Sequence, residues 1–281
     1  MTSPVPDDKL RLGGMALRNG LLVHGPTHWA AAVRDDSGAI RVASGPRPDL
    51  GGKAADGVPG VRGVLKLAEA MAVIPLVKRA LPEARLPMQD LQTLGAMGAA
   101  ALGGQAIRAS GRRAAAQGGP PSRRGGMGRE AAVALVSLAP ALLALRSGEL
   151  AAYHGVEHKS IAAYEDGEAA AEAAKEHDRC GSHLVAPMLA AAAVGNVAAR
   201  RAGLRGPAAE VAVGVGSAAV AVEVFAWGER HPESRLTRLL RRPGHEIQRA
   251  VGTREPTPQQ LEVGEAALAE ILRVEEAQAG S

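Results

Sequence analysis

Aromatic residues are scarce in this chain. Its 281 residues include two tryptophans, two tyrosines and one phenylalanine, although 46% of all residues are hydrophobic. The core must therefore be built from alanine, valine and leucine, and the many alanines and glycines favour close contacts between helices. This composition predicts a mainly α fold, an Ala-rich helical bundle, and argues against a sandwich with an aromatic interior.

Cysteine is almost absent. The single residue, Cys180, excludes an internal disulfide and is typical of a reducing compartment. The N-terminus has neither a basic opening nor an apolar run, so we expect no cleavable signal peptide.

Negative and positive residues nearly balance, leaving a net charge of +4 that is concentrated in arginine patches. The patch at 108–129 is interrupted by Gly, Pro and Ser, which predicts a disordered basic loop. No aromatic residues or nucleic-acid-binding motif accompany it. We therefore expect membrane lipid, and no nucleic acid, as the partner, and keep RNA binding by this loop only as a weaker alternative.

Four apolar segments follow one another along the chain, at 91–107, 131–145, 184–199 and 207–227. The last is long enough to cross a bilayer, for which about 20 residues are needed, whereas the others are equally typical of buried core helices. Composition alone thus leaves a soluble bundle and a membrane-embedded bundle open. Basic clusters between the segments do not settle the topology.

Residues 13–45 differ from the rest of the chain. Strand-like runs at 21–24 and 29–34 and a turn at 35–38 predict a small β-hairpin or meander. Near the other end, Thr257, Pro258 and Gln260 form a strong helix start. The predicted organisation is a disordered N-terminus (1–12), a β subdomain (13–45), a linker (46–60), helical segments (61–107), the basic loop (108–129), a helical domain (130–255), a C-terminal helix (256–276) and a tail (277–281).

The chemistry of the chain is concentrated in about thirty residues. On a helix, His154 and His158 rise on one face with Glu157 beside them, in the pattern H-x-x-E-H. Two such imidazoles can hold one metal ion, and the glutamate can take a proton from water at that ion. The alternative is an exposed helix turn whose polar side chains are merely solvated.

Further donors lie downstream. His177 and Cys180 are three residues apart, a spacing that suits zinc at a turn, although a lone cysteine is more often a buried, inert thiol. Glu223 lies within the last apolar segment, where a carboxylate needs a cation, a donor or a metal as partner. It is a third-ligand candidate, or else it pairs with an arginine.

These blocks resemble the YqhQ-like family of bacterial proteins, a domain of unknown function. The resemblance implies a multi-pass protein of the bacterial cytoplasmic membrane and a metal-dependent enzyme, a label that for the family is itself a prediction. The chain departs from the family at Asn19 and Val222 and in its less hydrophobic apolar segments. The matching residues are Gly13-Gly14, Gly20, Gly25-Pro26, Trp29-Ala30, Ala32-Val33-Arg34, Arg62-Gly63-Val64, Tyr153-His154-Gly155, Glu157-His158-Lys159, Tyr164-Glu165, His177, Arg179-Cys180-Gly181, Pro243-Gly244, Gln248 and Thr253-Arg254-Glu255-Pro256.

Two hypotheses follow. The first is a membrane-associated zinc hydrolase with His154 and His158 as ligands, Glu157 as general base, and His177, Cys180 or Glu223 completing the ligand set. The second is a non-enzymatic membrane scaffold or assembly protein, in which the His/Cys cluster binds metal structurally or forms a polar core. The sequence is compatible with a homo-oligomer and does not specify a substrate.

Overall fold

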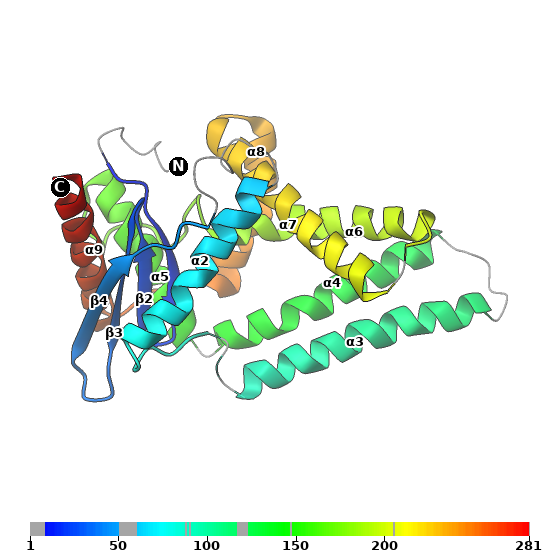
Figure 1. Ribbon diagram of the computed structural model, residues 1–281, viewed down its shortest axis with the longest axis horizontal. Coiled ribbons are helices and arrows are strands. Elements are labelled where there is room, and N and C mark those ends of the chain that lie inside the picture. Colours follow the sequence, from blue (N-terminus) through cyan, green and yellow to red (C-terminus); the bar gives the residue numbers. More distant parts are fainter. Residues whose placement is uncertain are drawn as a thin grey trace.

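A computed structural model describes residues 9–50, 61–87, 89, 91–116, 123–146, 148–204 and 206–280. Within these residues the molecule has two parts, a compact end built around a β-sheet and a long helical arm (Figure 1). The predicted disordered N-terminus through residue 8, the linker residues 51–60 and residue 281 of the tail lie outside the described residues.

The sheet is a four-stranded antiparallel meander in the order β1-β2-β3-β4, which confirms the predicted β element. Asp35 forms the predicted turn after β3, because its Oδ1 accepts hydrogen bonds from the backbone N–H groups of Ser37 and Ala39. Gly38 completes this turn with φ of 86°, a conformation that favours glycine. The strands are β1 (Gly13–Leu17), β2 (Gly20–His24), β3 (His28–Arg34) and β4 (Ile40–Pro46).

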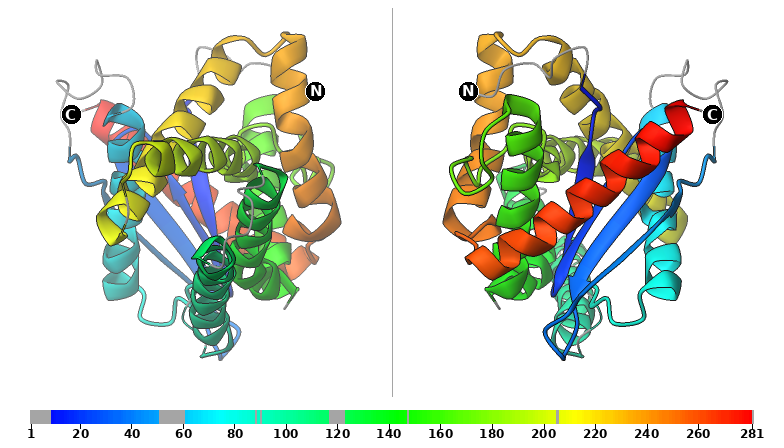
Figure 2. Two further views of the ribbon diagram at one scale, coloured as in Figure 1. Left: turned by 90° about the vertical axis from the view of Figure 1, so that its right-hand side faces the viewer. Right: turned by 90° about the vertical axis from the view of Figure 1, so that its left-hand side faces the viewer.

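Helices cover both faces of the sheet. Alternate residues of β2 explain why: Leu22 packs with Val73 and Val77 of α2 (Val61–Ala80), whereas Leu21 packs with α5 (Glu149–Asp166) and α9 (Pro258–Ala279). Figure 2 shows α9 lying across one face and α2 on the other. The sheet therefore has a buried apolar cluster on each face, and these two clusters form the core of the compact end.

The C-terminal helix α9 begins as predicted. The Thr257 hydroxyl accepts the N–H of Gln260, and the Gln260 side chain accepts the N–H of Thr257, so both members of a capping box are present. Near the other end of α9, Glu275 accepts hydrogen bonds from the backbone N–H groups of Thr27 and His28. The helix thus holds the turn between β2 and β3, and it continues to Ala279 beyond the expected limit at 276.

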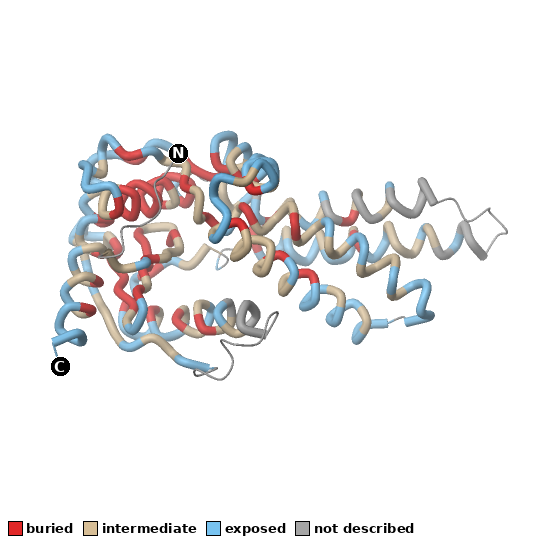
Figure 3. The backbone as a smooth tube through the Cα atoms, turned by 90° about the horizontal axis from the view of Figure 1, so that it is seen from above, coloured by how far each residue is buried: buried red, intermediate tan, exposed pale blue. Residues whose placement is uncertain are grey.

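The arm consists of two helical hairpins, α3 (Leu91–Ala116) with α4 (Arg123–Arg146) and α6 (Val185–Arg201) with α7 (Pro207–Arg230). Buried residues are concentrated at the compact end, and the arm is largely exposed or intermediate (Figure 3). The segment at 108–129 differs from the expected disordered loop, because it is helical at 108–116 and 123–129. Alanine and arginine are strong helix formers, which explains the difference; residues 117–122 lie outside the described residues.

Two helical stretches among the described residues are long and apolar enough to cross a membrane, Gly181–Arg201 and Pro207–Arg230. They contain the last two of the four predicted apolar segments. The end of α4 and α5 pass the same test only together, and they are bent by 85° at the break between them. Since α5 packs against both the sheet and α9, we assign it to the compact end.

Three short elements connect the parts. A 3-10 turn η1 (Gly181–Leu184) leads into α6, and helix α8 (Arg235–Ile247) follows α7. A π-helical turn η2 (Gln248–Gly252) continues α8 and returns the chain to α5. Such π turns occur frequently at functional sites.

Candidate metal centre

Helix α5 carries the predicted H-x-x-E-H residues, and most of the helix is buried. Gly155 lets the segment after η2 lie directly against it, because a Cβ at this position would be 2.2 Å from the carbonyl oxygen of Arg254. The Arg254 N–H also donates to the carbonyl of Ala151. The site is therefore enclosed between β1, α5 and a segment about 100 residues further along the chain.

Three potential metal ligands converge at this place. One nitrogen each of His154 and His158 and the Sγ of Cys180 all lie within 4.8 Å of one another. His154 Nε2 is 3.4 Å from Cys180 Sγ, and the rings of the two histidines have centroids 4.4 Å apart. The structure thus brings together three of the five predicted ligands.

Backbone carbonyls fix the orientation of both imidazoles. His154 Nδ1 lies 2.8 Å from the carbonyl oxygen of Gly252, and His158 Nδ1 lies 2.6 Å from that of Lys175. A carbonyl can only accept, so each Nδ1 carries a proton, and in the neutral form of either ring the lone pair is on Nε2. Metal-binding histidines are typically held in this way.

The buried Nε2 of His158 has no hydrogen-bond partner among the described residues. Burial, together with the nearby His154, holds the pKa of His158 well below its usual value, so this ring is neutral. A neutral imidazole with an unsatisfied, inward-facing lone pair is costly unless a cation or a donor meets it.

Cys180 precedes η1, and its sulfur accepts the N–H of Ser182 at 3.4 Å. Burial raises the pKa of this thiol to about 11, so without a nearby cation it keeps its proton. A bound divalent cation would reverse that balance, since a coordinating thiol loses its proton.

Glu157 lies on the side of α5 that faces β1. A Cβ on Gly14 would lie 2.8 Å from Glu157 Cγ, so the glycine makes room for this side chain. Burial raises the pKa of Glu157, while His154 and the N–H of Ala16 partly oppose the increase. A carboxyl group with a raised pKa is suited to receive a proton at neutral pH.

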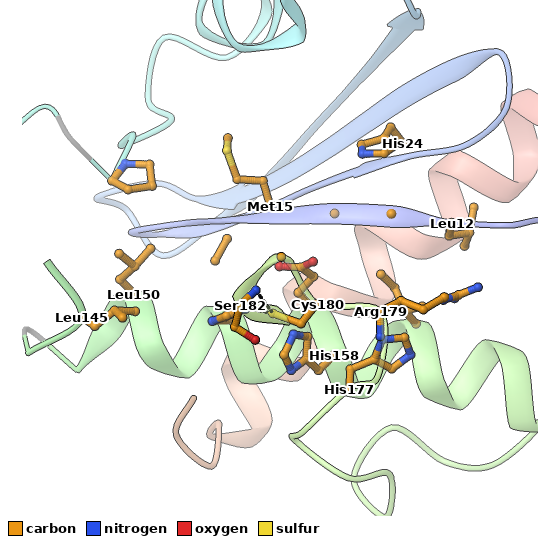
Figure 4. A pocket seen from close by; sticks show the side chains of 18 residues that line it. Leu12, Met15, His24, Leu145, Leu150, His158, His177, Arg179, Cys180 and Ser182 are labelled. Carbon is orange, nitrogen blue, oxygen red and sulfur yellow. Dashed lines mark hydrogen bonds between the residues drawn. The ribbon is translucent and has the colours of Figure 1, made fainter. Parts of the chain in front are cut away.

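A pocket of about 480 Å³ opens between β1 and α5. In Figure 4, Cys180 lies between the strand that carries Met15 and the helix that carries His158. Glu157 and all three potential ligands line this pocket, and apolar side chains form much of the remaining wall. These are Leu12, Met15, Ala16, Pro87, Leu145, Leu150 and Ile161.

His177 lies beside the three ligands but is oriented differently. Its Nδ1 accepts the N–H of Arg179, so in the neutral ring the proton is on Nε2, which lies 3.5 Å from a carboxylate oxygen of Glu165. Arg179 also donates to the same carboxylate. Burial lowers the pKa of His177. The ring contacts His158, with centroids 5.7 Å apart, without presenting it a lone pair.

Glu223, the other predicted ligand, lies elsewhere. It lines a separate pocket between α7 and α8 together with Val220 and Trp227, and it is not among the residues that line the pocket of the three ligands. A separation of 65 residues from His158 does not determine whether two helices meet.

In a second group, Asp178, His183 and His245, one potential ligand atom of each residue also lies within 4.8 Å of the others. Its polar atoms already have partners in the protein. His245 Nε2 is 2.8 Å from Asp178, and the two ring nitrogens of His183 lie at hydrogen-bond distance from the carbonyls of Arg241 and His177. We interpret this group as a set of hydrogen bonds that holds η1 and the segment before it against α8.

Two buried polar residues hold the site together in roles that the sequence did not predict. Gln248 is fully buried, accepts the N–H of His177 through its side-chain oxygen and donates to Ser182 Oγ. Lys159 donates to the carbonyls of Ala171 and Ala173 and pairs with Glu255. Neither residue type signals such a role in the sequence, because the partners are mostly backbone groups.

Fold and site together define a mainly helical protein with an N-terminal antiparallel sheet, two apolar helices able to span a membrane, and a His/Cys group able to hold a metal. Residues 148–274 match the model of a family described as a protein of unknown function (DUF1385). The matched segment contains all three potential ligands and Glu157. No curated protein and no solved structure matched the chain.

Proposed function

We propose that this protein is a membrane-associated, zinc-dependent hydrolase whose metal is held by His154, His158 and Cys180. The observation that carries the proposal is the buried, unpartnered Nε2 of His158, whose ring lies beside a second imidazole and a thiol. Nitrogen and sulfur donors in this combination suit zinc better than the hard cations magnesium or calcium, which prefer oxygen.

The donor set supports a catalytic site more than a structural one. Structural zinc sites use four protein ligands, whereas catalytic sites use three and leave a position for water or substrate. The fourth candidate, His177, accepts the N–H of Arg179 at Nδ1, and its Nε2, which has no hydrogen-bond partner among the described residues, lies 3.5 Å from a carboxylate oxygen of Glu165. The three donors border an open pocket with room for water or substrate, which favours the enzyme over the scaffold.

When bound, zinc would supply Lewis acidity toward water and toward a carbonyl oxygen. The protein's own residues then have defined tasks. Glu157, lining the same pocket, accepts a proton from water on its carboxylate and passes it to the leaving group. The carbonyls of Gly252 and Lys175 keep the two imidazoles in the ligating tautomer. The apolar pocket wall excludes bulk water and favours a substrate with an apolar portion.

Association with the bacterial cytoplasmic membrane is part of the same proposal. The two apolar helices supply the physical basis, since both are long enough to cross a bilayer. Within the most apolar 18-residue stretch of each helix, the protein buries only 11% and 17% of the stretch. Cys180 of the metal centre immediately precedes η1, which leads into α6, so the site would lie close to the membrane surface.

The experiment measures metal content and hydrolysis on protein purified in detergent. We expect about one zinc ion per chain in the wild type and in Glu157→Gln, and almost none in His158→Ala, because removing one of three ligands abolishes tight binding. Hydrolysis of a panel of ester and amide substrates should be lost in both variants.

His231→Ala is the matched control, since His231 is exposed and stacks on Trp227 away from the site. This variant should keep its metal and its activity. In cobalt-loaded protein, Cys180→Ser should lose the thiolate-to-metal absorption band. Unchanged metal content in His158→Ala would overturn the metal site, while full activity in Glu157→Gln would overturn only the hydrolytic mechanism.

A further inference from the structure

Strand β1 lies at an edge of the sheet, because in the order β1-β2-β3-β4 it pairs with β2 alone among the described strands. On the other side of an edge strand, backbone N–H and C=O groups are available to pair with a further extended chain. The surroundings of this free side of β1 therefore determine what could bind there.

The backbone groups of β1 alternate in direction. Leu17 and Gly20 are partners across a two-residue turn, which is a hydrogen-bonded position of such a hairpin. The bonds to β2 therefore come from every second residue of β1, namely Gly13, Met15 and Leu17. The intervening residues, Gly14 and Ala16, direct their N–H and C=O groups to the free side.

Two contacts locate the free side in the molecule. The N–H of Arg18, the next residue of the outward series, donates to the carbonyl of Arg85 at 2.8 Å. The N–H of Ala16 faces the carboxyl group of Glu157. Within the described part of the chain, the outward N–H and C=O of Gly14 have no hydrogen-bond partner. Gly14 thus offers one donor and one acceptor beside the proposed general base.

The free side of β1 opens into the pocket of the metal centre. Gly13 and Gly14 both line this pocket, and since glycine has no side chain, it is the strand backbone that forms the wall there. A Cβ on Gly14 would lie 2.9 Å from Glu157 Oε1, which places the carboxyl group directly beside the edge. In Figure 4, Cys180 lies between the strand that carries Met15 and the helix that carries His158. The edge and the potential metal ligands therefore face one space.

The shape of this space limits what can pair with the edge. Helix α5 and the segment 179–182 also line the pocket and enclose the space beside β1. A second copy of the protein would have to present its own β1, which is enclosed by the same elements. A single extended chain has no such walls, and the volume of about 480 Å³ lies within the range of ligand sites.

We propose that the substrate is a polypeptide that binds in extended form as an additional strand along the free side of β1. Its backbone pairs with Gly14, and its alternate side chains contact the apolar wall of the pocket. The inference rests on the proposed function and names its substrate class. In the reaction the oxygen of water bonds to the amide carbon and the C–N bond breaks, while the proton accepted by Glu157 passes to the departing nitrogen.

Hydrogen–deuterium exchange tests the strand pairing without relying on hydrolysis. The probe is unfolded casein, added in excess to the full-length Glu157→Gln protein in detergent, which should bind the polypeptide without cutting it. Chelator-treated wild-type protein provides a second form that does not cut. In both forms, exchange of the Gly14 amide, measured in the fragment 12–17, should become several-fold slower with casein.

The matched control is the fragment 40–46 of β4, the other edge strand, which does not line the pocket and should exchange as before. Unchanged exchange of the fragment 12–17 would overturn the proposal. Protection that appears without casein and increases with protein concentration would also overturn it, because a second copy would then cover the edge.

Peptides that span the bond cut in casein provide a sharper test. Methylation of one amide nitrogen at a time removes one donor, so binding should weaken about ten-fold at every second position. The positions between are the matched controls and should bind as before. Equal losses at successive positions would contradict binding as a strand.

Small substrates separate this inference from the proposed function. Hydrolysis of nitrophenyl acetate without hydrolysis of casein would overturn the polypeptide substrate and keep the hydrolase. Protection of Gly14 by casein without hydrolysis of any substrate would keep the polypeptide ligand and overturn the hydrolytic function.

Discussion

The compact end and the arm differ in how far their apolar side chains are buried. In the compact end, Leu17, Leu21 and Val33 are completely buried, whereas in the arm Leu102 and Val194 are 68% and 70% exposed. Both parts contain ordinary helices of similar length, so secondary structure does not explain the contrast. The compact end covers its apolar side chains with its own residues. The arm leaves many of its apolar side chains exposed, and for α6 and α7 we propose that lipid covers them.

The largest effect should come from placing a charge on each part. Val215→Arg puts a cation near the middle of α7, which costs about 2.5–3.5 kcal/mol if the helix spans a bilayer. The matched control is Val42→Arg on β4, where the side chain has similar exposure, 41% against 51% for Val215. Membrane fractionation should show impaired insertion for the first variant only. Identical behaviour of the two variants would show that α7 lies in water.

A comparison of two glycines sharpens the contrast in packing. Gly155→Ala should destabilise the compact end by about 1–3 kcal/mol, because the new methyl group meets the backbone of Arg254 and the backbone cannot easily move. Gly216→Ala on α7 meets no atom within 4 Å and should be neutral or stabilising by up to about 1 kcal/mol. Thermal unfolding in detergent measures both. A stable Gly155→Ala protein would contradict the close approach.

Two changes in α9 should have smaller effects. Thr257→Ala removes the capping box and should cost about 1 kcal/mol, while Arg273→Ala breaks an exposed ion pair with Glu270 and should cost less than about 0.5 kcal/mol. Urea unfolding followed by the fluorescence of Trp29 reports on the sheet that α9 covers. Equal losses for the two variants would show that α9 is not anchored through its first turn.

Much of the fold could be predicted where the signal is local. The turn at Asp35 and the capping box at Thr257 depend on a few neighbouring residues, and both were predicted and are confirmed. The helical continuation through 108–116 was not predicted, because the Gly and Ser residues there favour a loop, whereas the helix propensity of the surrounding alanines prevails in the structure.

The sequence predicted which side chains could bind a metal, but not which backbone carbonyls would orient them. His154, His158 and Cys180 were singled out by residue type and are brought together in the structure. The carbonyls of Gly252 and Lys175 orient the rings, yet every residue has a carbonyl, so no residue type marks them. The placement of Glu223 in another pocket shows the same limit for ligands that come from distant helices.

The hydrogen bonds from Thr27 and His28 to Glu275 join the beginning of the chain to its end. During translation the strands leave the ribosome first, the helices of the arm follow, and α9 emerges last. The part of the sheet that α9 covers therefore stays uncovered while the arm is made, and we expect the membrane insertion proposed for α6 and α7 to precede completion of the core. A nascent chain stalled before residue 258 should then be inserted already, yet remain sensitive to protease at its sheet.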